Sequence, residues 1–260
     1  MRKIHKSDVE NELSRFKLQY PEASWDDFRD YDQSRSYKAI KKIAFDDQFD
    51  ICAYCEQNLA DEHENNKRIE HFRSKSDTAD FNIALDWFNL LGVCVGGSDY
   101  ENKRKYELPA NLSCDSHKAF LENVEKITDK DWYGKVLFPL ELPEPHMLFT
   151  FDKSTGMLKP NKDYCENLEI EPNKNQNTVE LVEETIRVFN LNCERLNSAR
   201  LKVFYYSEKV IKLAREQNDK HKLESLINSW SRCKPLPFQT TRDIILSSNS
   251  LLNKLRTEVK

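Results

Sequence analysis

Two cysteines three positions apart carry the strongest chemical signal in this 260-residue sequence. Cys52-Ala53-Tyr54-Cys55 places two thiols on one tight turn, from which both can bind the same tetrahedral Zn²⁺. A redox pair or a chance spacing is the alternative, but a redox pair calls for a thioredoxin-like βαβ context that these neighbours lack. The sequence therefore predicts one half of a zinc site.

A closed zinc site needs two more ligands. Cys94 and Cys114 are the nearest free cysteines, and His117 and His63 are reserves. A polar insert from Val95 to Ser113 separates the two cysteines, and each of them taken alone is equally well explained as a small buried apolar side chain. Spacing alone leaves the ligand set open.

An acidic residue next to a histidine is the second chemical signal. Ile69-Glu70-His71-Phe72 has the pattern of a short strand, on which Glu70 and His71 point to opposite faces. A lone histidine is more often idle, but a histidine with a pKa near neutrality can accept a proton from an attacking water. We expect a cleft in which the two side chains reach one metal–water–phosphate assembly by different routes.

Basic side chains gather close to these residues. One group comprises Lys67, Arg68, Arg73 and Lys75, and a second is Lys103-Arg104-Lys105. Either run can be a solvated face with no ligand. Beside a phosphodiester site, however, such residues can hold backbone phosphates without reading the base sequence.

The bulk composition limits the class of protein. The formal net charge is −4, so any nucleic-acid site must rest on local basic charge. Seven cysteines in a chain with no secretion signal argue against a disulfide framework. No stretch approaches the roughly 18 apolar residues that span a bilayer. We therefore expect a soluble, cytoplasmic protein.

The elements that must position these residues suggest an α+β fold that is mainly helical. Residues 1–50 and 173–260 have helical patterns, residues 51–125 hold the chemistry, and residues 126–172 suggest a short-strand or hairpin segment. In that segment Val136-Leu137-Phe138 and Met147–Phe151 are the expected strands, with a turn at Ser154-Thr155-Gly156.

Three helices are expected after residue 173. The first starts at Asn177, with Glu180 three positions later, and carries Val179, Val182, Ile186 and Phe189. The second carries Leu196, Val203 and Val210, and the third carries Ile244, Ile245, Leu251, Leu252 and Leu255. These stripes either pack within the chain or exceed what one small core can bury, in which case a partner covers them.

The order of the motifs resembles the HNH endonuclease family, also called ββα-metal or His-Me finger nucleases. The matching residues are Cys52, Cys55, Glu70, His71, Asn89, Cys94, Cys114, Asp115 and Lys118. The resemblance is closer to one branch, the PtuB-type HNH subunit of Septu antiphage defence systems, which also occurs in retron-associated operons. The segments that carry it are residues 1–6, 52–56, 69–75, 84–90 and 189–196.

The resemblance implies a role for each matching residue. It makes His71 the general base, Glu70 and Asp115 the ligands of a catalytic Mg²⁺ or Mn²⁺, and Asn89 a brace for the loop that aims the histidine. The zinc ligands would be Cys52, Cys55, Cys94 and Cys114, and the substrate phosphates would meet Arg73, Lys75 and Lys118. Glu70 stands where aspartate is more usual in the family.

The implied function is that of a metal-dependent nuclease acting on DNA. A ribonuclease with the same site, for example one that cuts tRNA, is an alternative, as is a zinc-ribbon subunit that binds nucleic acid without cleaving it. The resemblance also implies a separate ABC-type ATPase of the PtuA kind as partner, since no Gly-rich phosphate loop is present here. In retron versions a reverse transcriptase and its RNA–DNA product join the assembly.

Overall fold

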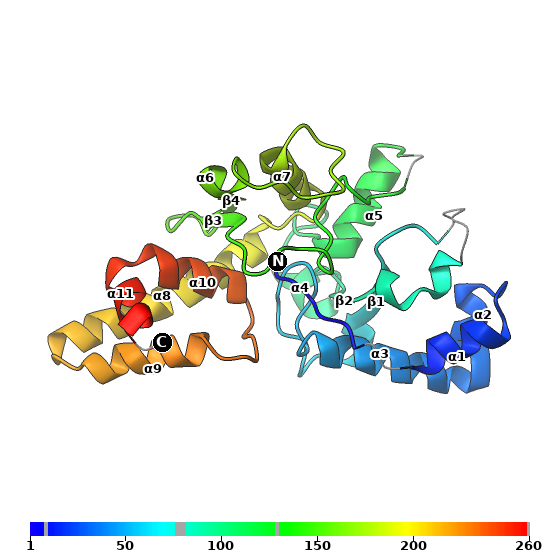
Figure 1. The fold of residues 1–260 in the computed structure, drawn as a ribbon, viewed down its shortest axis with the longest axis horizontal. Helices are drawn as coiled ribbons and strands as arrows, with labels where there is room; N and C mark the ends of the chain where they lie inside the picture. The colour runs from blue at the N-terminus through cyan, green and yellow to red at the C-terminus, as the bar shows by residue number, and fades with distance from the viewer. Residues whose placement is uncertain (8–9, 76–81, 128–129, 259–260) are drawn as a thin grey trace.

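A computed structural model describes residues 1–7, 10–75, 82–127 and 130–258 of the chain. Helices dominate it, and two antiparallel sheets of two strands each accompany them. Figure 1 shows a group of N-terminal helices at one end and an arm of C-terminal helices at the other, with β1 and β2 between them and β3 and β4 above the C-terminal arm. The fold is therefore α+β and mainly helical, as the sequence predicts.

The N-terminal helices form a small core of their own. They are α1 (Glu12–Gln19), α2 (Trp25–Asp30) and α3 (Arg35–Asp47). Capping boxes at Asn11 and Ser24 start the first two helices. The apolar faces of all three meet the loop before β2 in one cluster, whose buried members are Leu13, Phe16, Trp25, Phe28, Ile40, Ala44, Ala84, Leu85, Trp87 and Leu90.

The first sheet holds the residues of chemical interest. Strands β1 (Lys67–His71) and β2 (Leu90–Cys94) pair antiparallel, with His71 opposite Leu90 and Lys67 opposite Cys94. Every residue of β2 is buried, because α3 and α5 (Cys114–Val124) pack against this strand. The carboxyl end of β1 and the first turns of α5 are thereby fixed to one scaffold.

The polar insert between Cys94 and Cys114 closes on itself. Helix α4 (Tyr100–Lys105) lies within it, and the amide of Ser113 donates to the carbonyl of Gly96 over 2.9 Å. Gly96 has a φ of +61°, and a Cβ there would lie 2.1 Å from the Ser113 oxygen, so only glycine fits. The two cysteines therefore become neighbours whatever lies between them.

The hairpin expected after residue 126 is confirmed in part. Strands β3 (Phe149–Phe151) and β4 (Leu158–Pro160) pair antiparallel, and α6 (Lys162–Cys165) follows them. The strand expected at Val136-Leu137-Phe138 is wrong. The amide of Leu137 donates to the Thr185 hydroxyl over 2.8 Å, so this backbone is satisfied by a helix side chain instead of a partner strand.

Five helices lie in the described part of the C-terminal region, where the sequence analysis names three. They are α7 (Thr178–Val188), α8 (Glu194–Glu216), α9 (Lys220–Trp230), α10 (Gln239–Ser248) and α11 (Ser250–Glu258). The start at Asn177 is confirmed, since its side chain accepts from the Glu180 amide. The third helix was expected to be continuous, and that prediction is wrong. It is divided into α10 and α11 at Asn249, which is extended and whose side chain accepts from the amides of Leu251 and Leu252.

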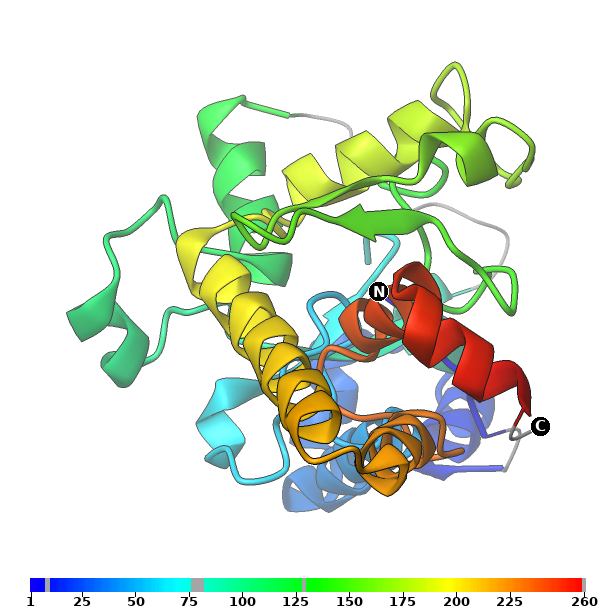
Figure 2. The same ribbon diagram turned by 90° about the vertical axis from the view of Figure 1, so that its left-hand side faces the viewer.

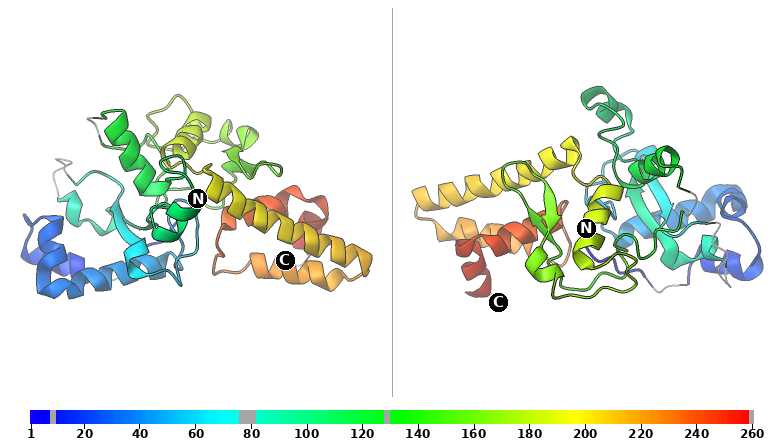
Figure 3. Two further views of the ribbon diagram at one scale, coloured as in Figure 1. Left: turned by 180° about the vertical axis from the view of Figure 1, so that it is seen from behind. Right: turned by 90° about the horizontal axis from the view of Figure 1, so that it is seen from above.

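The C-terminal arm is a helical unit with its own core. Figure 2 shows α8 running diagonally across the front of the view, and the rear view in Figure 3 shows α9 returning beside α8. Helices α10 and α11 complete this packing, which buries Leu252 and Leu255 and partly buries Leu251. The stripe on α7 is likewise covered by the central core, with Val182 and Phe189 buried. The interpretation that these stripes need a partner to bury them is therefore wrong.

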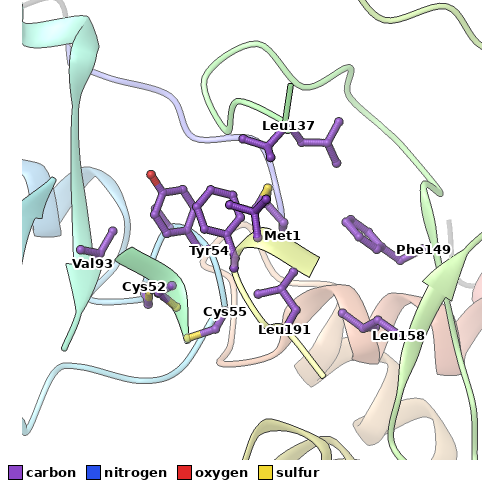
Figure 4. Close-up of a cluster of buried hydrophobic side chains, with 14 of the residues drawn as sticks. Met1, Cys52, Tyr54, Cys55, Val93, Leu137, Phe149, Leu158 and Leu191 are labelled. Carbon is purple, nitrogen blue, oxygen red and sulfur yellow. Dashed lines mark hydrogen bonds between the residues drawn. The ribbon is translucent and has the colours of Figure 1, made fainter. Parts of the chain in front are cut away.

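The central core joins segments from the whole chain. Its buried members come from the N-terminus, the cysteine turn, β2, the 130–160 region, α7 and α10. Figure 4 shows Cys52 and Cys55 at the edge of this cluster, with Tyr54 reaching into it. Among the described residues, none of the helices combines the length and the apolar character that a bilayer crossing needs.

Candidate functional site

Four buried cysteines converge on one point beneath the sheet. The Sγ atoms of Cys52 and Cys114 are 3.8 Å apart, those of Cys55 and Cys94 3.8 Å, and those of Cys94 and Cys114 3.7 Å. Four sulfurs at about 2.3 Å from a tetrahedral zinc ion would be separated by about 3.8 Å. All four sulfurs lie within 4.8 Å of one another, so the cluster can hold one metal ion.

Polar groups around the sulfurs suit a negatively charged metal centre. The amides of Cys94 and Gly96 donate to the sulfurs of Cys52 and Cys94 over 3.4 and 3.3 Å. Arg195, in the first turn of α8, donates to the Ser113 hydroxyl over 2.7 Å. Burial disfavours the charge of Arg195, but the cysteine sulfurs outweigh it and raise its pKa. The guanidinium thus supplies a positive charge beside the cluster of sulfurs.

The reserve zinc ligands lie elsewhere. His117 is turned toward α7, where its Nδ1 contacts the Val188 carbonyl over 2.9 Å. His63 is exposed, and its Nδ1 accepts from the Asn65 amide. Of the alternatives that spacing leaves open, the structure brings together the four cysteines.

His71 ends β1 in a half-buried position. Its Nε2 lies 3.0 Å from the Ala84 carbonyl oxygen, and the Trp25 ring stands edge-on at 4.5 Å between centroids. A carbonyl only accepts, so Nε2 carries the proton and Nδ1 keeps its lone pair. Burial lowers the pKa of His71 to about 4, and the bond to Ala84 opposes this only in part. The imidazole is therefore neutral at neutral pH, with Nδ1 as its basic nitrogen.

Glu70 faces the other side of β1 and meets α5. Its carboxylate pairs with the Lys118 ammonium, which also lies 3.7 Å from an oxygen of Asp115. Burial raises the pKa of Glu70 to about 8, with Lys118 opposing and Asp115 adding to the effect. Burial also disfavours the charge of Lys118, but the two carboxylates outweigh it and raise its pKa. Two carboxylates thus share one ammonium.

One cavity of about 420 Å³ brings the two halves of the site together. His71, Glu70, Asp115 and Lys118 all line it, although α5 follows β1 by more than forty residues. A neutral histidine and paired carboxylates in one cleft are suited to proton transfer and to holding a hard divalent cation. The expected shared cleft is therefore present, with Glu70 and His71 reaching it from opposite faces of β1.

The basic residues expected at the substrate have different positions. Lys75 is exposed and lines the cavity, whereas the Arg73 guanidinium lies 5.2 Å from the centre of the Tyr133 ring and is not among the lining residues. Lys103-Arg104-Lys105 is exposed on α4, away from the cavity lining. Two further cations, Arg29 of α2 and Lys130, do line it. No local pattern marks them, because they lie far from the motif in sequence.

Asn89 holds the backbone that follows His71. Its side-chain oxygen accepts from the Arg73 amide over 2.8 Å, and its amide group donates to the carbonyls of Arg73 and Ile83 over 3.1 and 3.2 Å. Its own carbonyl accepts from the Phe72 amide. Asn89 is buried and does not line the cavity, so its contacts are those of a residue that braces the loop.

We expect Asn89→Ala to slow cleavage by releasing this loop. The substitution leaves the Arg73 amide and two carbonyls without their partner, and each buried unsatisfied group costs roughly 1–3 kcal/mol. The thermal midpoint and the single-turnover rate should both fall. Asn102→Ala is the matched control, since the side-chain amide of Asn102 donates to Asp99, the N-cap residue of α4, away from the cavity lining. A variant that cuts at the wild-type rate would contradict the bracing role.

The comparisons with known proteins point to one class of enzyme. No protein-family model matches the chain. The chain is 44% identical over 257 residues to the Escherichia coli protein named "Retron Ec83 putative HNH endonuclease", covering 98% of this chain and 97% of that protein. The chain therefore belongs to the family of HNH endonucleases associated with retrons. It is a nuclease.

Proposed function

We propose that this chain is a metal-dependent endonuclease that hydrolyses phosphodiester bonds in DNA, with β1, β2 and α5 acting as its ββα-metal module. The observation that supports this best is the single cavity lined by His71, Glu70 and Asp115, which come from two separate elements. A neutral histidine beside two carboxylates is what water attack on a phosphodiester requires.

In the proposed mechanism, Nδ1 of His71 accepts the proton of the attacking water. The contact between Nε2 and Ala84 keeps the ring in the tautomer that makes this possible. Glu70 and Asp115 are the proposed ligands of Mg²⁺ or Mn²⁺, which when bound stabilises charge on the phosphate and on the leaving oxygen. The proposed resident of the four-cysteine cluster is Zn²⁺, because thiolates select zinc over harder cations.

The proposed substrate surface is the cationic rim of the cavity. Arg29, Lys67, Arg68, Lys75 and Lys130 line it. Such residues bind phosphates without reading bases, so a chain of net charge −4 can still hold nucleic acid here. Arg73 and Lys118 keep their proposed role as phosphate contacts only if their side chains leave the partners described above.

A ribonuclease with the same residues is the second candidate, because attack by water needs no 2′-hydroxyl. The decisive assay gives the purified protein supercoiled DNA and structured RNA separately, each with Mg²⁺, with Mn²⁺ and with a chelator that leaves zinc bound. We expect DNA cleavage that depends on the divalent ion. Cleavage of RNA alone would select the ribonuclease, and binding with no cleavage under any condition would select the non-catalytic zinc ribbon.

We further propose that the nuclease is the effector of an antiphage defence system of the Septu type. The support is the resemblance to PtuB-type subunits together with the retron named for the relative. The partner would be an ABC-type ATPase of the PtuA kind, joined in a retron operon by a reverse transcriptase and its RNA–DNA product. The neighbouring genes test this assignment, since an adjacent ATPase gene is expected. The cleavage assay described above should be run with and without that ATPase.

A further inference from the structure

Lys118 lies where a catalytic cation is expected. It is one helical turn from Asp115 on α5, and its ammonium contacts Glu70 while lying 3.7 Å from Asp115. Only 9% of the Lys118 side chain is exposed, against 52% for Lys130, which lines the same cavity. A lysine that served only to bind substrate phosphate would reach into the cavity as Lys130 does.

A divalent ion held by Glu70 and Asp115 cannot share this space with the ammonium. Mg²⁺ needs oxygens at about 2.0–2.1 Å, and Mn²⁺ takes similar ligands. The Lys118 ammonium contacts one carboxyl oxygen of Glu70 and lies 3.7 Å from one of Asp115, so it stands beside both groups that would hold the ion. Two cations this close also repel strongly in a buried site.

We propose that the Lys118 ammonium competes with a divalent cation for the carboxyl groups of Glu70 and Asp115, so that a bound ion must displace it. The inference rests on the proposed function for the assignment of Glu70 and Asp115 as ligands. Lys118 pairs with the buried Glu70 and the half-buried Asp115, and it lowers the affinity of the site for metal. Lys118 lines the cavity, so an ammonium displaced by the ion can pair with the substrate phosphate there.

The test measures metal affinity without nucleic acid. Mn²⁺ is titrated into the zinc-loaded protein and free Mn²⁺ is followed by electron paramagnetic resonance. Lys118→Met, which keeps the length of the side chain and removes its charge, should bind Mn²⁺ at least about tenfold tighter. Lys118→Arg keeps the charge and should bind no tighter than wild type. Lys130→Met, the matched control in the same cavity, should leave the affinity unchanged.

A stability measurement covers the case in which Lys118→Met folds poorly. Without the ammonium the carboxyl groups of Glu70 and Asp115 lose their shared partner, so the chelated variant should melt below wild type, and Mn²⁺ should raise its midpoint by more than it raises that of wild type. Lys118→Gln should behave in the same direction. Mn²⁺ affinity that is equal or weaker in both neutral variants overturns the proposal.

This outcome is separate from the fate of the proposed function. If the neutral variants fail to tighten Mn²⁺ binding while cleavage still needs His71 and a divalent ion, the inference is wrong and the nuclease mechanism stands. If the neutral variants bind Mn²⁺ more tightly while His71→Ala cuts as well as wild type, the role of Lys118 stands and the proposed nuclease mechanism is wrong. Absence of Mn²⁺ binding in every variant overturns the inference.

Discussion

His71→Ala is expected to lower the cleavage rate by roughly 10²–10⁴, the usual contribution of a positioned general base. The loss should appear in the rate of the chemical step and not in substrate binding, because His71 carries no charge at neutral pH. His63→Ala is the matched control, since that histidine is exposed and outside the cavity lining. Added imidazole should restore part of the activity by entering the space beside Trp25. A variant that retains the wild-type rate would remove His71 from the mechanism.

The pH dependence of the same reaction gives a second readout. Protonated His71 cannot accept a proton, so activity should be lost as the pH falls through the pKa of the histidine. Burial lowers that pKa to about 4, so the loss of rate that comes from His71 should lie near pH 4 and be separate from any change near pH 8, where burial places the pKa of Glu70. An acid limb centred near the ordinary value of about 6.5 would mean that the imidazole is solvated in the working enzyme.

Cys94→Ala is expected to abolish stoichiometric zinc binding and to unfold much of the protein at physiological temperature. A structural zinc ion contributes roughly 10–16 kcal/mol in small zinc domains, as much as the roughly 5–15 kcal/mol that stabilises a typical folded protein. The four sulfurs also belong to the central core, so that core would open with the site. Elemental analysis and thermal unfolding provide the measurements.

The control for that substitution is Cys165→Ala. Cys165 is equally buried, but its sulfur contacts the Leu148 carbonyl and lies outside the cluster. We expect full zinc content and only a small drop in the thermal midpoint, in the range of a typical core substitution. Unchanged zinc content in Cys94→Ala would show that the four-cysteine set is not the zinc site.

Much of the fold could be predicted from local sequence patterns. The capping signal at Asn177 and the turn at Ser154-Thr155-Gly156 depend on residues close in sequence, and both predictions are confirmed. The break between α10 and α11 also had a local signal, because Asn249 is a favourable N-cap residue that interrupts a continuous apolar pattern. No local signal spoke against the wrongly predicted strand at Leu137, since its backbone amide donates to the hydroxyl of Thr185, a distant residue of α7.

The candidate site likewise contains residues that the sequence pointed to and residues that only the tertiary fold brings there. The Cys52–Cys55 turn and the Glu70–His71 pair could be singled out from their residue types, whereas spacing left Cys94 and Cys114 open and the resemblance to HNH nucleases implied the full set. Trp25 against the imidazole and Arg29 in the cavity lining come from α2, whose sequence resembles that of any packing helix. The pairing of Lys118 with Glu70 joins two elements through the tertiary fold, so no spacing rule could have predicted it.

The closed base of the polar insert has a consequence for how this chain can change. The base of the insert is fixed, because Ser113 bonds to Gly96 and residues 110–112 bond to Asn190 and Arg195, while α4 lies between these fixed ends. Doubling the length of such a loop costs only about 0.6 kcal/mol of closure entropy. Lineages can therefore lengthen, shorten or replace the segment around α4 while Cys94 and Cys114 stay in register, and an epitope or fluorophore can be grafted there on the same grounds.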